Sequence, residues 1–173
     1  MSDLVTPPGS MRPARTIEKV SFIVSKGGID GIYPALIMAN GARAEGIEAN
    51  LFFTFFGLEA VHKRMNKRIR VATVGNAGLR LPTGLRLPTW IGWIPGVEWA
   101  MSKYFMHGME KLDVPPVDEF IEFISDTGAG LYACKLATDM FGYTKDDLVD
   151  QVKDIITVGE FFEVASGGDL VFT

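Results

Sequence analysis

Cys134 is the only cysteine of the chain, and its position is the first chemical feature of the sequence. A single thiol builds neither a disulfide framework nor a cysteine-rich zinc site, so it is either a packing residue or one reactive sulfur. It stands where a short apolar segment ends and a helical segment begins, within residues 130–142. Backbone N–H groups at a helix N-terminus favour a thiolate, and Lys135 adds positive charge if its side chain turns toward the sulfur. Position alone leaves both interpretations open, because free cysteines are commonly buried.

A second group of candidates follows two other apolar segments. Lys26, Gly27 and Gly28 lie between a predicted strand and a predicted helix, where backbone N–H groups bind anions. The glycines lack the spacing of a G-x-G-x-x-G motif or a P-loop, so a simple turn is the favoured interpretation. Thr54 is expected at the same edge of the sheet, and Lys26 is a candidate for attracting an anionic ligand.

Basic residues cluster between positions 62 and 70. The favoured interpretation is a solvated helix face, and the alternative is a docking site for an acidic partner or an anion. Asp139 is expected to cap or pair near its own helix. With only two histidines in the chain, no metal site is expected. The members of this basic cluster are His62, Lys63, Arg64, Lys67, Arg68 and Arg70.

Length and composition predict one globular domain. The chain has 173 residues, 47% of them hydrophobic, and a net charge of -4, which argues against nucleic acid as a partner. Residues 1–16 are expected to be a flexible tail and not a signal peptide, because they lack an apolar core. The domain is therefore expected over residues 17–173, without a transmembrane span. A lone cysteine fits the reducing cytoplasm.

Strand-like and helix-like segments alternate along the chain. Helices are expected from Asp30 to Gly46, near 58–65, over 117–124, from Thr144 onward and over 160–165. Such alternation is typical of a doubly wound α/β fold, and the unbroken apolar run 51–56 indicates a strand covered on both faces. Five strands are expected, at residues 19–25, 47–56, 131–134, 154–158 and 169–172, and a sixth at 70–75 is left open.

Residues 72–116 form an insertion that is too long for a simple connection. Its second half has helical periodicity through Val97, Met101 and Met109, and it carries all three tryptophans of the chain. Three interpretations of residues 90–112 stay open. A subunit contact is favoured because interface cores are enriched in aromatic residues and methionine, a lid over Cys134 comes second, and a membrane-surface helix third.

Several short segments carry a resemblance to a known family. Residues 39–42 (ANGA), 52–58 (FFTFFGL), 131–134 (LYAC) and 139–142 (DMFG) stand in the same order as in the DsrE/DsrF-like family of sulfurtransferases and sulfur carriers. Residues 94–96 and 112–116 resemble its larger members, which are often labelled peroxiredoxin-like. The resemblance covers nearly everything from Val20 to the C-terminus.

The resemblance implies a flavodoxin-like α/β domain with a mainly parallel sheet, and a cysteine that carries sulfur as a persulfide. The matching position is Cys134. From their own positions in the sequence, Lys26, Gly27, Gly28, Lys135 and Thr54 are candidate anion-binding residues, with an anionic donor such as thiosulfate. Family members typically form trimers or hexamers and exchange sulfur with TusA-like carriers or rhodanese-type enzymes. No cofactor is expected for this chain.

One departure from the family pattern concerns a second cysteine, which some relatives carry in the insertion. A relay between two cysteines of one chain is excluded here, so carriage is at least as well supported as sulfurtransferase turnover. The chemistry requires an ionised sulfur that solvent reaches. A thiol peroxidase is one alternative, but its usual threonine three residues before the cysteine is Leu131 here. A non-catalytic ligand-binding or assembly module is the other.

Overall fold

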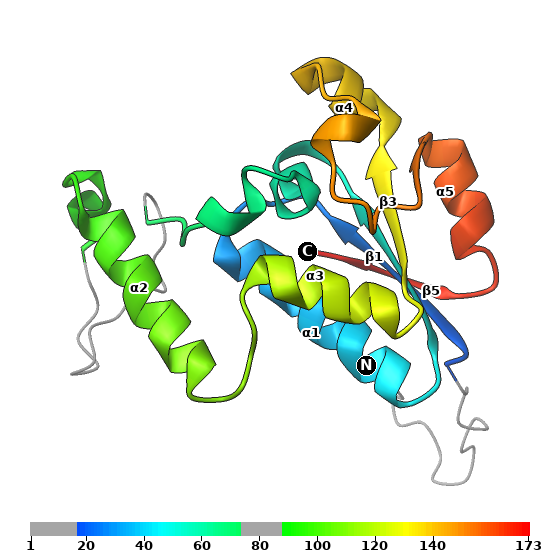
Figure 1. Cartoon of the computed structure of the whole chain (residues 1–173), viewed down its shortest axis with the longest axis horizontal. Helices are drawn as coiled ribbons and strands as arrows, with labels where there is room; N and C mark the ends of the chain where they lie inside the picture. The colour runs from blue at the N-terminus through cyan, green and yellow to red at the C-terminus, as the bar shows by residue number, and fades with distance from the viewer. Residues whose placement is uncertain (1–16, 74–87) are drawn as a thin grey trace, which may run out of the picture.

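The computed structural model describes residues 17–73 and 88–173, and the expected tail at residues 1–16 lies outside them. Its centre is a parallel sheet in the order β4-β3-β2-β1-β5 (Figure 1). The predicted five-stranded parallel sheet is thus confirmed. The order differs from the 2-1-3-4-5 order of flavodoxin itself, so the likeness to flavodoxin concerns the layers and the parallel pairing. The strands are β1 (Lys19–Val24), β2 (Glu48–Phe53), β3 (Gly130–Cys134), β4 (Asp154–Ile156) and β5 (Asp169–Phe172).

Side chains alternate between the two faces of the sheet along each strand, and helices cover both of these faces. On one face, Phe52 of β2 stacks on Phe161 of α5, with ring centroids 4.4 Å apart. Its neighbour Leu51 points to the other face, where α1 and α3 pack together. The α-helices are α1 (Ile29–Ala44), α2 (Val97–Glu110), α3 (Val117–Asp126), α4 (Lys135–Phe141) and α5 (Val158–Ala165), and the 3-10 turns are η1 (Phe55–Val61), η2 (Asn66–Arg68), η3 (Thr89–Trp93) and η4 (Lys145–Asp147).

The segment after η2 is not a strand over residues 70–73, and residues 74–75 lie outside the described part. The backbone groups that a strand would use are engaged elsewhere. The carbonyl oxygen of Arg70 accepts a hydrogen bond from the Ile29 amide at the start of α1. The Val71 amide donates to Ser102 Oγ of α2. This segment therefore connects α1 with the insertion.

The helix predicted from Thr144 is a single 3-10 turn, η4. Thr144 and Asp147 form a capping box, but the chain leaves the turn at once. Leu148 forms an isolated antiparallel bridge with His62, and the Lys63 amide donates to the carbonyl of Asp147. These hydrogen bonds to a distant segment hold the backbone in an extended conformation, whereas a helix would need hydrogen bonds between residues close together in the sequence. Likewise, the expected helix near residues 58–65 is the 3-10 pair η1 and η2.

The predicted helix of the insertion is confirmed as α2, which lies at the far left of Figure 1, away from the sheet. Met101 and Ser102 are buried, whereas Trp90, Trp93 and Trp99 are exposed. Within residues 17–73 and 88–173, no helix has the length and apolar character needed to span a bilayer.

Candidate rim site at the carboxyl ends of the strands

The carboxyl ends of β1, β2 and β3 meet at one rim of the sheet, as parallel pairing requires. Cys134 is the last residue of β3 and pairs with Ile156 of β4. It is also the N-cap residue of α4, with extended backbone angles of φ -73° and ψ 119°. Phe53 pairs with Ala133, so Thr54 and Cys134 each directly follow this last paired position of β2 and β3. Both residues therefore lie at the carboxyl rim of the sheet.

The sulfur of Cys134 is less accessible than the sequence analysis expects. The residue is only 3% exposed, and the expectation of an open thiol is wrong for the single chain. Ala137 and Thr138 in the first turn of α4 are buried as well, because this turn folds onto the end of the sheet. The two residues that follow Cys134, Lys135 and Leu136, are exposed, so the buried thiol lies just beneath the protein surface.

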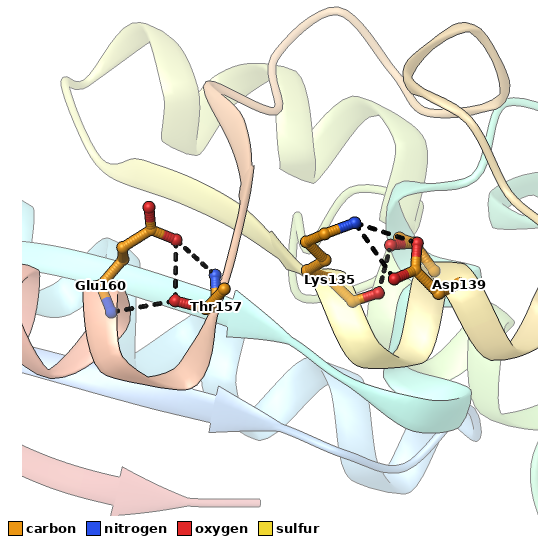
Figure 2. A network of polar contacts seen from close by, with 5 residues as sticks. Lys135, Asp139, Thr157 and Glu160 are labelled. Carbon is orange, nitrogen blue, oxygen red and sulfur yellow. Dashed lines mark hydrogen bonds and ion pairs between the residues drawn. The ribbon is translucent and has the colours of Figure 1, made fainter.

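Lys135 does not add free positive charge at the thiol. Its Nζ lies 3.1 Å from Asp139 Oδ2 in an exposed pair one helical turn apart (Figure 2). The expected pairing of Asp139 near its own helix is confirmed. Exposed pairs with this spacing contribute only about 0.3–0.5 kcal/mol. The ion pair therefore lies on the exposed side of α4.

The neighbouring turn between β4 and α5 is held by a capping box, also drawn in Figure 2. The Thr157 amide donates to Glu160 Oε2 at 2.7 Å, and the Glu160 amide donates back to Thr157 Oγ1 at 3.3 Å. The hydrogen bonds that the Thr157 amide and hydroxyl donate to the Glu160 carboxylate hold the pKa of Glu160 below its usual range. The turn that follows Ile156, the partner of Cys134, is therefore well defined.

Lys26, Gly27 and Gly28 line a separate open depression of about 450 Å³. A side chain at Gly27 would approach the Phe56 carbonyl oxygen to 2.8 Å, so the absence of one lets the loop lie against η1. The lining carries both signs of charge, and burial raises the pKa of Glu59. Neither Cys134 nor Thr54 is among the lining residues, so the structure does not join the two groups of candidates in one cavity. The charged residues of the depression are Lys26, Arg68, Arg70, Asp30, Glu59 and Glu98.

Aromatic residues that the sequence analysis did not single out connect α4 with the basic cluster. The Phe56 ring lies 5.9 Å from that of Phe141, and Phe141 lies 5.5 Å from Tyr143. Tyr143 meets the edge of His62 at 4.7 Å, and its Oη lies 3.5 Å from Met65 Sδ. Phe141 belongs to residues 139–142, one of the segments that resemble the family, but only the fold shows which residues it contacts.

Within the described ranges, no group of three or more His, Cys, Asp and Glu side chains is placed to hold a metal ion. Fold and site together define a three-layer α/β protein with one cysteine at the carboxyl rim of a parallel sheet. Residues 16–172 match the model of the DsrE/DsrF/DrsH-like family. The chain belongs to this family, as the sequence analysis predicts.

Two curated relatives extend the comparison over nearly the whole chain. The sulfur carrier protein DsrE2 of Allochromatium vinosum is 30% identical over 155 residues, covering 88% of this chain and 96% of that protein. The uncharacterized protein YrkE of Bacillus subtilis is 25% identical, covering 88% of this chain and 94% of its own.

Two solved structures share the fold. MTH1491 of Methanobacterium thermoautotrophicum, a protein of unknown function, superposes with a TM-score of 0.54 at 11% identity, covering 90% of this chain and 98% of that one. The ychN protein of E. coli superposes with a TM-score of 0.52 at 15% identity, covering 91% of this chain and 100% of that one.

Proposed function

We propose that this protein is a sulfur carrier that holds sulfane sulfur as a persulfide on Cys134. The observation that carries the proposal is the position of the only cysteine, at the end of β3 and the start of α4. Membership of the DsrE/DsrF/DrsH-like family and the 30% identity to a sulfur carrier protein support a role in sulfur relay.

Loading is a thiol exchange without net oxidation. The Cys134 thiolate attacks the terminal sulfur of a donor persulfide, a new S–S bond forms at Sγ, and the donor departs as its thiolate. Delivery is the reverse step, in which the thiolate of an acceptor takes the terminal sulfur and Cys134 is regenerated. Because the chain has one cysteine, donor and acceptor thiols belong to other molecules. TusA-like or rhodanese-type proteins are the proposed partners, in the cytoplasm.

Access to the sulfur is part of the proposal, since the thiol is almost fully covered in the single chain. The cover is thin: α4 has seven residues, ends at Gly142 in the left-handed conformation, and exposes Leu136 and Met140. Short elements with few buried contacts open at low free-energy cost. We therefore assign the gating of Cys134 to displacement of the first turn of α4.

Assembly into trimers or hexamers belongs to the same proposal. The exposed tryptophans of η3 and α2 support a subunit contact at the insertion, because aromatic side chains are enriched in interface cores. A second copy that packs there would cover Trp90, Trp93 and Trp99. Sedimentation of the full chain, with Trp93→Asp as the variant, tests this part.

The experiment for carriage is intact mass spectrometry of the reduced protein after incubation with polysulfide, thiosulfate or a persulfidated carrier. The expected result is a gain of whole sulfur atoms that dithiothreitol removes and that Cys134→Ser abolishes. Formation of sulfenic acid by peroxide without any gain of sulfur would instead identify a thiol peroxidase. Absence of both modifications would leave Cys134 a packing residue.

A further inference from the structure

Exposed apolar side chains gather beside Cys134 on α4 and η1. Leu136 and Met140 lie one turn apart on α4, and both are more than half exposed. Phe56 of η1 is equally exposed and reaches α4 through its ring contact with Phe141. Together with the exposed Met65 and the half-buried Phe141 and Tyr143, this set is called the α4 surface; its members are Phe56, Met65, Leu136, Met140, Phe141 and Tyr143.

The α4 surface continues without a break into the basic cluster. Tyr143 contacts both Met65 and His62, and the Arg64 amide donates to His62 Nδ1 at 3.1 Å. Beyond these residues lies an open depression of about 530 Å³. Its lining consists of Glu59, His62, Arg64, Met65 and Arg68. Met65 therefore belongs to the apolar area and to the basic depression at once.

Two guanidinium groups at this depression, those of Arg64 and Arg68, have no ion pair within 4 Å among the described residues, and the charge of Arg64 also acts on Asp147. Three other cations of the cluster are engaged: Lys63 pairs with Asp150, Lys67 with Asp118, and Arg70 with Glu98. Arg64 and Arg68 make no side-chain ion pair with any described residue. Both are exposed, and Glu59 is the only acid in the lining.

We infer that the α4 surface with Arg64 and Arg68 is the docking site of a protein partner that presents an acidic segment with apolar side chains. The chain has a net charge of -4, so two arginines without an ion pair among the described residues, next to apolar side chains, favour the approach of an acidic partner at this surface. A small anion would use the charges and leave the apolar side chains unused. The partner's role in sulfur transfer rests on the proposed function, but the docking itself does not.

The test measures binding of a short fluorescein-labelled peptide of alternating glutamate and leucine to the full chain carrying Cys134→Ser, by fluorescence anisotropy. The dissociation constant is expected to rise at least about tenfold in Arg64→Glu/Arg68→Glu. The matched control is Lys111→Glu/Lys153→Glu, which changes the net charge equally at two other exposed positions and is expected to leave binding nearly unchanged. Arg64→Gln/Arg68→Gln should give an intermediate loss of peptide affinity. This variant controls for misfolding of the glutamate variant.

The apolar half of the surface has its own pair of variants. Leu136→Asp is expected to weaken the same peptide several-fold, whereas Leu112→Asp, equally exposed at the end of the insertion, should not. Equal losses in both charge variants, or no loss in Leu136→Asp, would overturn the inference. Displacement of the peptide from wild type and from Leu136→Asp by the same concentration of inorganic phosphate, with equal peptide affinity in the two, would instead indicate a small-anion site and overturn the inference.

The two proposals fail in different ways. If wild-type protein gains sulfur but binds the glutamate peptide no better than its lysine counterpart, the docking surface is wrong and carriage stands. If peptide binding follows the arginines while Cys134 takes up no sulfur, carriage is wrong and the docking surface stands.

Discussion

The backbone of Gly57 lies directly against the carbonyl oxygen of Val24, so closely that a Cβ atom at position 57 would overlap it. The Gly57 amide also donates to the carbonyl oxygens of Ser25 and Thr54, at 3.2 and 2.9 Å. This approach ties η1 to the end of β1 and forms the rim on which Thr54 and Cys134 lie. Glycine is required here for space, since its backbone does not adopt a positive φ.

Gly57→Ala is therefore expected to lower the free energy of unfolding by about 1–3 kcal/mol, because the added methyl group displaces backbone on both sides. Urea denaturation measures the loss. Gly41→Ala is the matched control: it lies inside α1 with nothing within 4 Å of the new methyl group, and it should stabilise by about 1 kcal/mol. An unchanged unfolding midpoint in Gly57→Ala would contradict this account of the rim.

A second prediction concerns Ser21, which is fully buried in β1 on the face that α5 covers. Its hydroxyl has no hydrogen-bond partner among the described residues. Burying an unpaired hydroxyl is unfavourable, so Ser21→Ala is expected to raise the free energy of unfolding by about 1 kcal/mol. Thr157→Ala, which removes the cap of α5, should lower it by a similar amount. A destabilised Ser21→Ala would show that the hydroxyl is satisfied.

Periodicity and composition were sufficient to predict all five strands and the helices α1 to α5. They succeed at the strands, α3 and α5 because burial of an apolar face decides these elements locally, whereas α1 exposes Ile37 and Met38. They fail at residues 70–73 and 144–148, where hydrogen bonds to Ile29, Ser102 and Lys63 determine the backbone. No local pattern contains such distant partners.

The same distinction applies to the site. The position of Cys134 between strand and helix can be deduced from neighbouring residues, and so can the pairing of Asp139. The burial of the sulfur cannot, because it depends on how the first turn of α4 folds onto the sheet. The aromatic contacts that lead from Phe56 to His62 join segments far apart in the chain, so only tertiary structure shows them.

A third prediction follows from that burial. The Cys134 thiol should react with a bulky aromatic disulfide reagent at least about tenfold more slowly than an exposed thiol on the same helix, since reaction requires opening. Cys134→Ser/Leu136→Cys provides the reference, because Leu136 is 69% exposed. Absorbance of the released thiolate gives both rates. Equal rates would mean that α4 does not cover the sulfur.

Exposure of the Cys134 sulfur should also depend on the stability of α4, the helix that covers it. Asp139→Pro interrupts the hydrogen bonds of α4, and it is expected to bring the reaction of Cys134 close to the rate of the exposed reference. Asp139→Asn removes only the exposed ion pair with Lys135 and should change the rate little. A proline variant that stays as slow as wild type would show that another element covers the thiol.

A fourth prediction uses Tyr33, which joins α1 to the chain leading into α3. Its Oη donates to the Pro115 carbonyl oxygen at 3.0 Å and lies 3.7 Å from Met106 Sδ of α2. Burial, with a smaller contribution from the charge of Asp118, raises the pKa of Tyr33 from 10.0 to about 12. The fold therefore favours the neutral phenol.

The sign of the effect follows from linkage. Below pH 10 the phenol is neutral in the folded and the unfolded state, so its contribution to the free energy of unfolding is fully present. Between pH 10 and about 12 only the unfolded chain loses the proton, so the free energy of unfolding falls as pH rises. Tyr33→Phe should remove this part of the alkaline loss and lower the plateau at neutral pH by about 1 kcal/mol, because the hydrogen bond to Pro115 is gone. Tyr104→Phe, at an exposed position, should keep the wild-type slope. Parallel curves for Tyr33→Phe and wild type in urea denaturation above pH 10 would show that Tyr33 ionises as freely in the folded protein as in the unfolded chain.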